Sequence, residues 1–570
     1  MSSPLTLIEA LQRTAAVHGD DRGVTYHLTV PESQFRGYAE LDRHARTIAD
    51  ALSAGGYAVG DRAVVALSPG LAWADALFGI LFAGLTFVPA PTGGYGDASA
   101  LASRVAGISR GSDATVIITD AAMRAVLDES GTELPAPVVL LEDLLASGSA
   151  GAWSAPQIDG ETTAVLFFTS GSTGDPKGVI GTHSGLLATV EGCDELFGIG
   201  PESTVVGWAP LHHAMGLLLQ VIVPVASGAR TVITTTELFQ RRPLSWLQLI
   251  SLYRGTVSVA GNFAYALCVQ FATDERVAEL DLSSLTTLIS GSEPVRPETV
   301  AAFIERFAPA GLDPTTIAPA LGMTEAMLVS CKPIGTGFVV RRVDADRLEQ
   351  GQLVPSDDDS ATRVISNGRP PSSTTIRIVD AEAGEPVADG TVGEIWISSP
   401  MVSPGYFRRP DATAETFGHR LPGDDRSYMR SGDLGVVLDG ELYITGRLKE
   451  LIILRGRNVY PQDIEAAASA LSPALGIAAA FELDDHPAPV GIIVEYDTSE
   501  LPDDHDHEQL LALVGAELVR RFSLPSVAVG LVAPGSVPRT ATGKVRRKPT
   551  RSLVEADSVP FLHASGFGAR

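Results

Sequence analysis

The stretch Thr169-Ser-Gly-Ser-Thr-Gly-Asp-Pro-Lys-Gly178 combines the residue types that hold phosphate groups. Its glycines let backbone amides approach an anion, its hydroxyls donate hydrogen bonds, and Lys177 adds a mobile positive charge. Ser and Gly are equally typical of flexible linkers, but an apolar, strand-like run, Ala164–Phe168, precedes this loop directly. We therefore predict a phosphate-binding loop of a nucleotide site, formed by Thr169, Ser170, Gly171, Ser172, Thr173, Gly174 and Lys177.

The order of residues excludes the P-loop of common ATPases, which requires a lysine followed directly by Ser or Thr. Here Lys177 is followed by Gly178 and Val179. The loop instead resembles the phosphate loop of the adenylate-forming superfamily, the acyl and aryl ligases that convert a carboxylate into an acyl-AMP. The resemblance implies ATP and Mg²⁺ as cofactors. It extends over essentially the whole chain, because five further segments follow in the order that the superfamily requires.

The first two of these segments resemble the walls of the acid and adenine sites. In Pro210–Leu217, His213 is the counterpart of a histidine that lines the passage between the phosphates and the acyl pocket. A histidine with an ordinary structural role fits the residues equally well. The apolar run from Leu288 ends in a glycine turn, which by the resemblance walls the adenine, although a plain strand-to-helix turn would look the same. The residues implied are Gly291, Ser292, Glu293 and Pro294.

The third segment, Ala320–Glu325, resembles the part of the site nearest the phosphates. By the resemblance, Thr324 meets the α-phosphate and Glu325 holds Mg²⁺. A carboxylate oxygen suits this hard cation, which keeps most of its waters. Taken alone, either residue would be an ordinary Thr or Glu at the N-terminus of a helix. The remaining nucleotide-binding residues implied here are Leu321, Gly322 and Met323.

The last two segments bring charged groups from near the carboxyl end. Asp433, at an expected turn after a strand, is suited to accept both ribose hydroxyls, although a plain turn aspartate is also common beside glycine. Arg447 resembles an arginine near ribose and phosphate, and Lys449 resembles the hinge residue. Lys544 lies in the one clearly basic run of the chain and resembles the catalytic lysine that bridges the substrate carboxylate and the α-phosphate. The alternative for that run is a solvated loop.

Several phrases favour one branch of the superfamily, the fatty-acyl-AMP ligases. They are Asn262–Tyr265, Glu293–Pro297 and Gly456–Glu465, together with extra sequence near 330–366. In that branch, the insertion restrains the small domain and disfavours CoA, so that the acyl group passes to the phosphopantetheine thiol of an acyl carrier protein. The enzymatic alternative is an acyl-CoA ligase that uses free CoA. Lesser alternatives are an acyl transferase that does not adenylate and a non-catalytic nucleotide-binding scaffold.

The chain departs from this branch at three positions. Ala214 replaces an aspartate, Leu321 an aromatic residue and Ser292 an alanine. The missing ring removes about 1 kcal/mol of stacking on adenine. The expected substrate is a fatty or other hydrophobic carboxylic acid, and a bulkier or cyclic acid of secondary metabolism remains open. Lipid or polyketide metabolism, including antibiotic biosynthesis, is the expected setting.

The secondary-structure elements expected around these residues indicate an α/β fold. Short β-branched runs such as Ala63–Leu67 and Thr256–Ala260 alternate with longer Ala- and Leu-rich stretches, which predicts parallel sheets with helices. We expect a large N-terminal domain over residues 1–447, with parallel-rich sheets and the insertion near 330–366. Residues 448–570 are expected to form a smaller, mobile α+β domain that carries the catalytic lysine.

Bulk properties limit the partners. The chain has 570 residues and a net charge of −26, which argues against binding to nucleic acid or to an anionic membrane. Three cysteines without paired spacing argue against a disulfide framework or a cysteine-based zinc site. The start of the sequence lacks the order of a signal peptide, and the apolar segment Leu217–Val225 is too short to span a membrane. We therefore expect a cytoplasmic protein that does not insert into a membrane.

Overall fold

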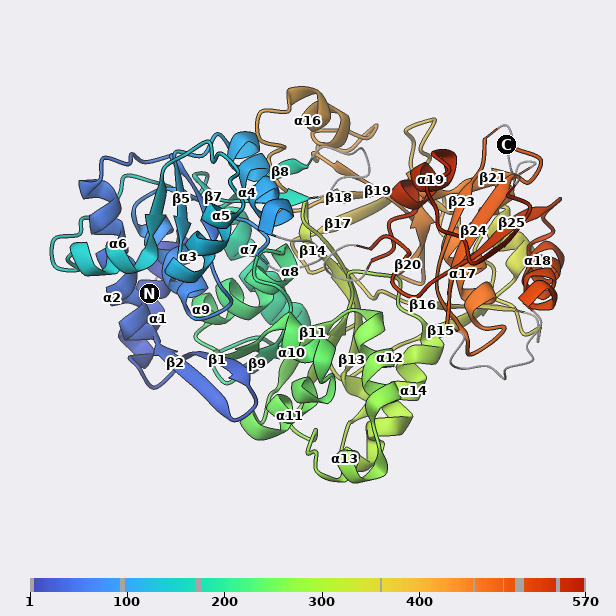
Figure 1. Ribbon diagram of the computed structural model, residues 1–570, viewed down its shortest axis with the longest axis horizontal. Coiled ribbons are helices and arrows are strands. Elements are labelled where there is room, and N and C mark those ends of the chain that lie inside the picture. Colours follow the sequence, from blue (N-terminus) through green and yellow to red (C-terminus); the bar gives the residue numbers. More distant parts are fainter. Residues whose placement is uncertain are drawn as a thin grey trace.

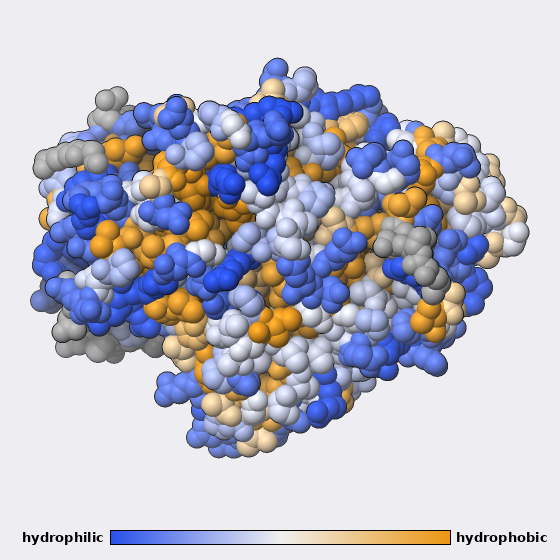
Figure 2. All heavy atoms as spheres, turned by 180° about the vertical axis from the view of Figure 1, so that it is seen from behind, coloured by the Kyte–Doolittle hydropathy of each residue, from blue (hydrophilic) through white to orange (hydrophobic). Residues whose placement is uncertain are grey.

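The computed structural model describes residues 5–92, 98–169, 176–358, 361–454, 457–484, 486–497, 507–539 and 544–567. A large N-terminal part is built on three larger sheets, and a smaller C-terminal domain is built around a fourth (Figure 1). The predicted α/β class, with its division into a larger and a smaller part, is confirmed. The face seen from behind shows separate hydrophobic areas among hydrophilic ones (Figure 2), as is ordinary for a globular protein.

The first sheet has six strands in the order β6-β5-β3-β4-β7-β8. All neighbours are parallel except β7 and β8, which form an antiparallel pair on either side of the predicted phosphate loop. Most of its Val, Ile and Leu side chains are fully buried, as expected where helices cover both faces of a parallel sheet. The strands are β3 Arg62–Ala66, β4 Thr86–Pro89, β5 Val116–Thr119, β6 Val138–Leu140, β7 Thr163–Thr169 and β8 Lys177–Thr182.

The second sheet has eight strands in the order β14-β13-β12-β11-β9-β10-β1-β2. Its inner strands are parallel, and only the edge pairs β1–β2 and β13–β14 are antiparallel. The carboxyl ends of β9, β11, β12 and β13 therefore lie at one edge of the sheet. The strands are β1 Gly23–Thr29, β2 Glu32–Gly37, β9 Thr204–Gly207, β10 Arg230–Thr234, β11 Val257–Ala260, β12 Thr287–Ser290, β13 Ile317–Met323 and β14 Met327–Cys331.

Helices surround these two sheets, and the largest apolar core lies between them. Among the described residues, no helix is both long and apolar enough to cross a bilayer. The helices are α1 Leu7–His18, α2 Tyr38–Ala54, α3 Ala72–Phe82, α4 Ala98–Ser112, α5 Ala121–Glu129, α6 Leu141–Ser147, α7 His183–Phe197, α8 Ala214–Leu217, the π-helix η1 Leu218–Ile222, α9 Val223–Ser227, α10 Thr236–Arg241, α11 Leu244–Tyr253, α12 Asn262–Phe271, α13 Asp274–Ala278, α14 Pro297–Phe307, and the 3₁₀ turns η2 Ala308–Ala310 and η3 Pro314–Thr316.

The third sheet is antiparallel and adjoins the C-terminal domain (Figure 1). Before it, the predicted insertion forms a two-stranded hairpin that carries a short helix. The hairpin consists of β15 Val340–Val343, α15 Ala345–Glu349 and β16 Thr362–Ile365. The sheet consists of β17 Thr375–Val379, β18 Gly393–Ser398, β19 Met429–Leu438 and β20 Glu441–Arg447, with α16 Pro410–Thr416 between β18 and β19.

The C-terminal domain follows the turn η4 Leu448–Glu450. It has its own apolar core, which includes Ile452, Ile464, Val494 and Leu531. Its sheet order is β23-β24-β25-β26, with a separate ribbon β21–β22. The elements are β21 Ile452–Leu454, β22 Arg457–Val459, α17 Pro461–Ser469, β23 Leu475–Glu482, β24 Val490–Tyr496, α18 His507–Phe522, β25 Val527–Val532, α19 Arg547–Glu555 and β26 His563–Ser565.

Candidate active site

The site lies where the loops after β9, β11, β12 and β13 meet the C-terminal domain. A single cleft there is lined by every predicted site residue whose side chain the structure describes. These residues are Lys177, His213, Gly291, Ser292, Glu293, Pro294, Leu321, Gly322, Met323, Thr324, Glu325, Asp433, Arg447, Lys449 and Lys544. The order of segments in the sequence therefore becomes a common surface in space.

The predicted phosphate loop falls mostly outside the described part of the chain. Ser170, Gly171, Ser172, Thr173 and Gly174 are not among the described residues. Thr169 is the last residue of β7, and Lys177 is the first residue of β8. Phosphate binding by this loop stays a prediction, with Lys177 as the member that the structure places on the cleft.

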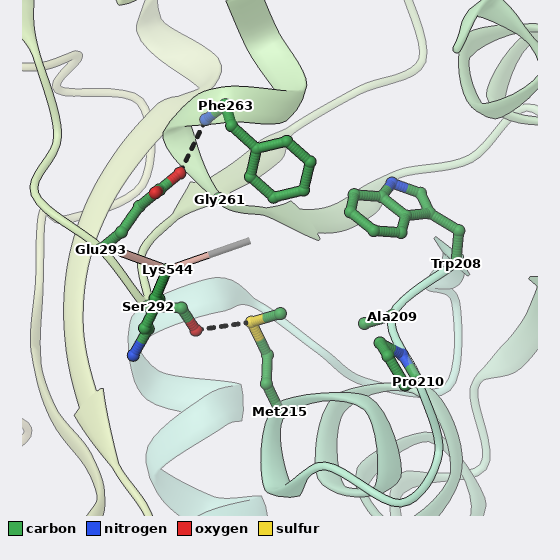
Figure 3. Close-up of a pocket in the computed structure, with 9 residues that line it drawn as sticks. All are labelled: Trp208, Ala209, Pro210, Met215, Gly261, Phe263, Ser292, Glu293 and Lys544. Atoms are coloured by element: carbon green, nitrogen blue, oxygen red, sulfur yellow. Dashed lines mark hydrogen bonds between the residues drawn. The ribbon is translucent and has the colours of Figure 1, made fainter. Parts of the chain in front are cut away.

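Lys544 belongs to the C-terminal domain but lies in a small pocket otherwise formed by N-terminal residues (Figure 3). Burial lowers the pKa of Lys544, and the nearby Arg447 lowers it further, whereas the carboxylates of Asp433 and Glu293 act in the opposite direction. The ammonium group is thus close enough to the predicted ribose and adenine residues to feel their charges. The pocket is lined by Trp208, Ala209, Pro210, Met215, Gly261, Phe263, Ser292, Glu293 and Lys544.

Glu293 is held against the start of α12. The backbone N–H of Phe263 donates to Glu293 Oε1 at 2.7 Å (Figure 3). Gly261 permits this contact, because a Cβ at that position would lie 2.9 Å from the same oxygen. Burial raises the pKa of Glu293, while the bond from Phe263 and the charge of Lys544 act to lower it. The positive end of the helix dipole favours a carboxylate here.

The rest of the small pocket is apolar and aromatic. The rings of Trp208 and Phe263 meet edge to face, with centroids 5.8 Å apart, and Trp208 stacks on Phe239 at 3.8 Å. On the opposite side, the hydroxyl of Ser292 donates to the sulfur of Met215 at 3.1 Å (Figure 3). Ser292 has φ +70, an uncommon conformation for a residue other than glycine. The backbone turns sharply at this departure from the family pattern.

The histidine pair lies at the start of α8. His213 accepts a hydrogen bond at Nδ1 from the backbone N–H of Met215 at 3.3 Å, so its proton in the neutral ring is on Nε2. Burial lowers the pKa of His213 to about 4, and Lys544 contributes to that shift. Burial also lowers the pKa of His212 to about 3. Both rings are neutral at pH 7. His213 caps a helix and also lines the cleft, so both a structural role and a place in the passage to the acyl pocket fit the structure.

Thr324 and Glu325 lie in the tight turn that joins β13 to β14. The alternative that they begin a helix is wrong, because the chain reverses into an antiparallel strand at this point. Glu325 Oε1 accepts a hydrogen bond from the hydroxyl of Tyr406 at 3.0 Å. The carbonyl of Glu325 accepts a bond from the N–H of Ser403 at 2.8 Å. Both the backbone and the side chain of Glu325 are thus held by the same neighbouring segment.

The carboxylate of Glu325 fits a magnesium ion. Within the described ranges, no group of three or more His, Cys, Asp and Glu residues is arranged to hold a metal by itself. Mg²⁺ bound with a nucleotide usually takes one or two carboxylates and is otherwise held by phosphates and water. Glu325, whose carboxylate lies on the cleft, is an oxygen donor of this kind.

Tyr406 is a cleft residue that sequence reasoning missed. Besides its bond to Glu325, its ring lies beneath Lys177, with Nζ 4.8 Å from the ring centroid. Tyr406 also forms an isolated antiparallel bridge with Val179 of β8. Its contacts come from segments far away in the sequence, and the local Pro-Gly pair before it indicates only a turn. Nothing in the sequence around Tyr406 therefore pointed to its place between two site residues.

Asp433 and Arg447, which are predicted to bind the ribose, both line the cleft. The predicted turn position of Asp433 is wrong, because this residue lies inside β19 and faces Arg447 of β20 in register. The neighbouring Gly432 has φ +71, and the strand pairing is irregular nearby. A glycine is common both in turns and in such irregular strands, so the local sequence resembles a turn. Arg447 Nε donates to Asp433 Oδ1 at 2.8 Å. Asp433 raises the pKa of Arg447, so this guanidinium remains charged.

The part of the cleft around Leu321, which is predicted to face the adenine, is apolar. Leu321 is 8% exposed and packs in a cluster with Ile395 and Met429. Gly322 follows it in close contact with the neighbouring strand, since a Cβ there would lie 2.7 Å from the carbonyl oxygen of Met327. Leu321 lines the cleft without a ring for stacking, as its departure from the family pattern implies.

One ion pair joins the C-terminal domain to the insertion, and two others hold elements of the domain together. Arg457 of β22 pairs with Glu349, the last residue of α15 in the insertion, at 2.5 Å. Within the domain, Arg547 pairs with Glu465 of α17 at 2.7 Å and with Glu450 of η4 at 2.5 Å. The segment after Lys544 is thereby fastened both to a helix and to the turn where the domain begins.

The sequence profile described as AMP-binding enzyme matches residues 11–407. The chain belongs to this family. One relative of this AMP-binding enzyme is the medium-chain-fatty-acid–[acyl-carrier-protein] ligase JamA of Moorena producens. The two are 36% identical over 90% of this chain and 89% of that protein.

Solved structures of fatty acyl-adenylate ligases resemble this AMP-binding enzyme over almost its full length. One, from work on the E. coli and L. pneumophila enzymes, has a TM-score of 0.88 and 31% identity, and the match covers 97% of this chain and 98% of that one. Another, from L. pneumophila in complex with acyl adenylate and pyrophosphate, has a TM-score of 0.76 and 30% identity over 99% and 98%. The chain is therefore an adenylate-forming ligase, and the predicted similarity to fatty-acyl-AMP ligases is confirmed.

Proposed function

We propose that this ligase activates a fatty or other hydrophobic carboxylic acid with ATP and Mg²⁺ and passes the acyl group to the phosphopantetheine thiol of an acyl carrier protein. One observation carries the proposal. Lys544 of the C-terminal domain lies beside Ser292 and Glu293, on the cleft that also holds Thr324 and Glu325. A cation from one domain thus reaches the place where the resemblance puts the carboxylate and the α-phosphate.

The chemistry requires two anions to meet. A carboxylate oxygen attacks the α-phosphorus and pyrophosphate leaves, so positioning and neutralisation of charge supply most of the catalysis. In our assignment, Lys544 attracts both reactants, and Asp433 with Arg447 fixes the ribose. Thr324 meets the α-phosphate, and the loop from Thr169 to Lys177 holds the leaving pyrophosphate. Glu325 would hold Mg²⁺, which supplies neutralising charge to the phosphates when bound.

The acid chain has an apolar continuation of the cleft available. The cleft reaches into the core between α7, η1 and the second sheet. The residues that line this part are buried, and almost all are apolar, so a hydrophobic chain gains free energy by entering it. They include Cys193, Phe197, Leu218, Val259, Ile289 and Leu328.

In this proposal, the C-terminal domain, which begins at residue 448, rotates relative to the N-terminal domain, which ends at residue 447. Lys449 pairs with Glu415 at 3.6 Å, and both side chains are about two-thirds exposed, at 64% and 65%. Such surface pairs contribute about 0–1 kcal/mol, so a rotation at Lys449 would break it at little cost. Rotation would withdraw Lys544 and open a path for the thiol.

Two features support a carrier protein rather than CoA as acceptor. The ion pair between Glu349 and Arg457 joins the insertion to the C-terminal domain, and a restrained domain is what the resemblance associates with poor use of CoA. The relative from Moorena producens carries an acyl carrier protein in its name. Location in the cytoplasm stays a prediction.

The experiment is a two-step assay. The protein is first incubated with Mg-ATP and a panel of linear, aromatic and polycyclic acids, and acyl-AMP is detected by mass. The acyl-AMP formed is then offered to free CoA and to a holo carrier protein in parallel. We expect one acid class to give acyl-AMP and the carrier protein to be acylated faster than CoA. Faster transfer to CoA would favour the acyl-CoA ligase, and no release of pyrophosphate with any acid would favour a non-catalytic scaffold.

A further inference from the structure

Two groups of opposite charge share one side chain in the cleft. Tyr406 donates its hydroxyl proton to Glu325 Oε1 at 3.0 Å and presents its ring face to Lys177 Nζ at 4.8 Å from the centroid. The cation and the carboxylate are thus both held by Tyr406, one by its ring and the other by its hydroxyl.

The segment around Tyr406 is fixed on both sides. The N–H of Phe407 donates to the carbonyl of Gly178, and the N–H of Ile180 donates to the carbonyl of Gly405, so the segment is bonded to β8. The side chain of Tyr406 is 9% exposed and packs edge to face on Phe417, with centroids 5.3 Å apart. Its ring and hydroxyl therefore have a defined place before any nucleotide binds.

We propose that Tyr406 is a positioning residue of the triphosphate site, which holds Lys177 and Glu325 apart and keeps each free for its own partner. The inference rests on the proposed function, since it takes Lys177 as a phosphate ligand and Glu325 as the magnesium ligand. Without Tyr406, the two side chains would be free to pair with each other. That pair would have to break before a magnesium–triphosphate complex entered.

The two halves of this role reside in different parts of the side chain. The hydroxyl acts on Glu325, and such outer partners of a metal ligand typically change metal affinity by about 10-fold to 100-fold. The ring acts on Lys177, and a cation over an aromatic face accounts for about twofold to fivefold in binding. The hydroxyl is the donor in the bond to Glu325, because an ionised carboxylate can only accept.

The experiment measures ATP affinity by calorimetry, once in EDTA and once with Mg²⁺, on the full chain without an acid substrate. Tyr406→Phe keeps the ring and loses the hydroxyl. We expect its affinity in EDTA to stay within about twofold of the parent, and the gain in affinity on adding Mg²⁺ to fall by about 10-fold. Tyr406→Leu should in addition weaken binding in EDTA by about twofold to fivefold.

Phe417→Leu is the matched control, because it alters the packing of Tyr406 and makes neither of the two polar contacts. We expect both affinities of this variant to stay within about twofold of the parent. A Tyr406→Phe variant with the full magnesium gain would overturn the proposal, as would identical behaviour of the Phe and Leu variants in EDTA. Failure of the parent to activate any acid, with these binding differences intact, would instead contradict the proposed function alone.

Discussion

Lys544 shows how single residues set the conditions for chemistry in this site. Burial and Arg447 lower its pKa, so the free enzyme loses the ammonium charge at a lower pH than an exposed lysine would. In the proposed mechanism, the two anionic reactants favour the charged form once they are bound. The group is therefore poised to gain from the approach of the substrates, at the cost of sensitivity to alkali.

This sensitivity gives a prediction for pH dependence. We expect kcat/KM of acyl-AMP formation to fall as pH rises, with the loss centred below the ordinary lysine value of 10.5. In the proposed mechanism the protonated amine is the active form, so activity falls as pH rises past the pKa of Lys544 in the free enzyme. Lys544→Arg should move the loss to higher pH, since a guanidinium keeps its charge. If kcat/KM falls at the same pH in that variant, the loss of activity belongs to another group.

Gly261 gives a second prediction at the scale of one residue. An alanine Cβ would lie 2.9 Å from Glu293 Oε1 and 3.2 Å from the ring of Phe263, so the Glu293 carboxylate must move off the helix N-terminus. We expect Gly261→Ala to slow pyrophosphate exchange by about 10-fold, because small misplacements near reacting groups are costly. Gly107→Ala is the control, since its Cβ meets nothing within 4 Å. Equal exchange rates in the two variants would show that the position of Glu293 is unimportant.

Elements carry the coupling between the domains. Arg547 fastens the start of α19 to α17 and to η4 through Glu465 and Glu450. Glu465 also accepts the N–H of Ala480 in β23 at 2.9 Å, which extends the connection to the sheet. A rotation near Lys449 would therefore move Lys544 together with the domain as a unit.

The hairpin of the insertion gives a prediction at this scale. Arg457→Ala removes the ion pair between β22 and α15. A partly exposed pair contributes about 0–1 kcal/mol, so we expect transfer of the acyl group to CoA to rise by up to about fivefold. Adenylation should be unchanged. The measurement compares CoA and holo carrier protein as acceptors of supplied acyl-AMP.

A matched control exists in the same hairpin. Arg363 of β16 pairs with Glu298 of α14 at 3.2 Å, and both partners belong to the N-terminal part. Arg363→Ala removes a comparable pair without touching the C-terminal domain, and we expect it to leave the choice of acceptor as it was. An Arg457→Ala variant that behaves like Arg363→Ala would show that this ion pair does not restrain the domain.

For the molecule as a whole, the sequence predicted the class of fold and the common location of the site residues. Strands such as β3, β7 and β11 are short β-branched or apolar runs, which can be recognised from neighbouring residues alone. The order of the motifs along the chain then indicated which loops contribute to the site. Asp433 was assigned to a turn because Gly432 beside it looks the same in a turn and in an irregular strand. Tyr406 was missed because its role depends on contacts with residues far away in the sequence.

Lys544 of the C-terminal domain reaches a pocket of the N-terminal part, and the half-reactions of Lys544→Ala test whether this contact serves adenylation alone. Acyl-AMP formation and transfer from supplied acyl-AMP to a holo carrier protein are measured separately. We expect a loss of about 100-fold or more in the first step, as for removal of a group that stabilises developing charge. We expect transfer to stay within about twofold of the parent, because the lysine has then left the site. An equal loss in both steps would rule out this division of roles.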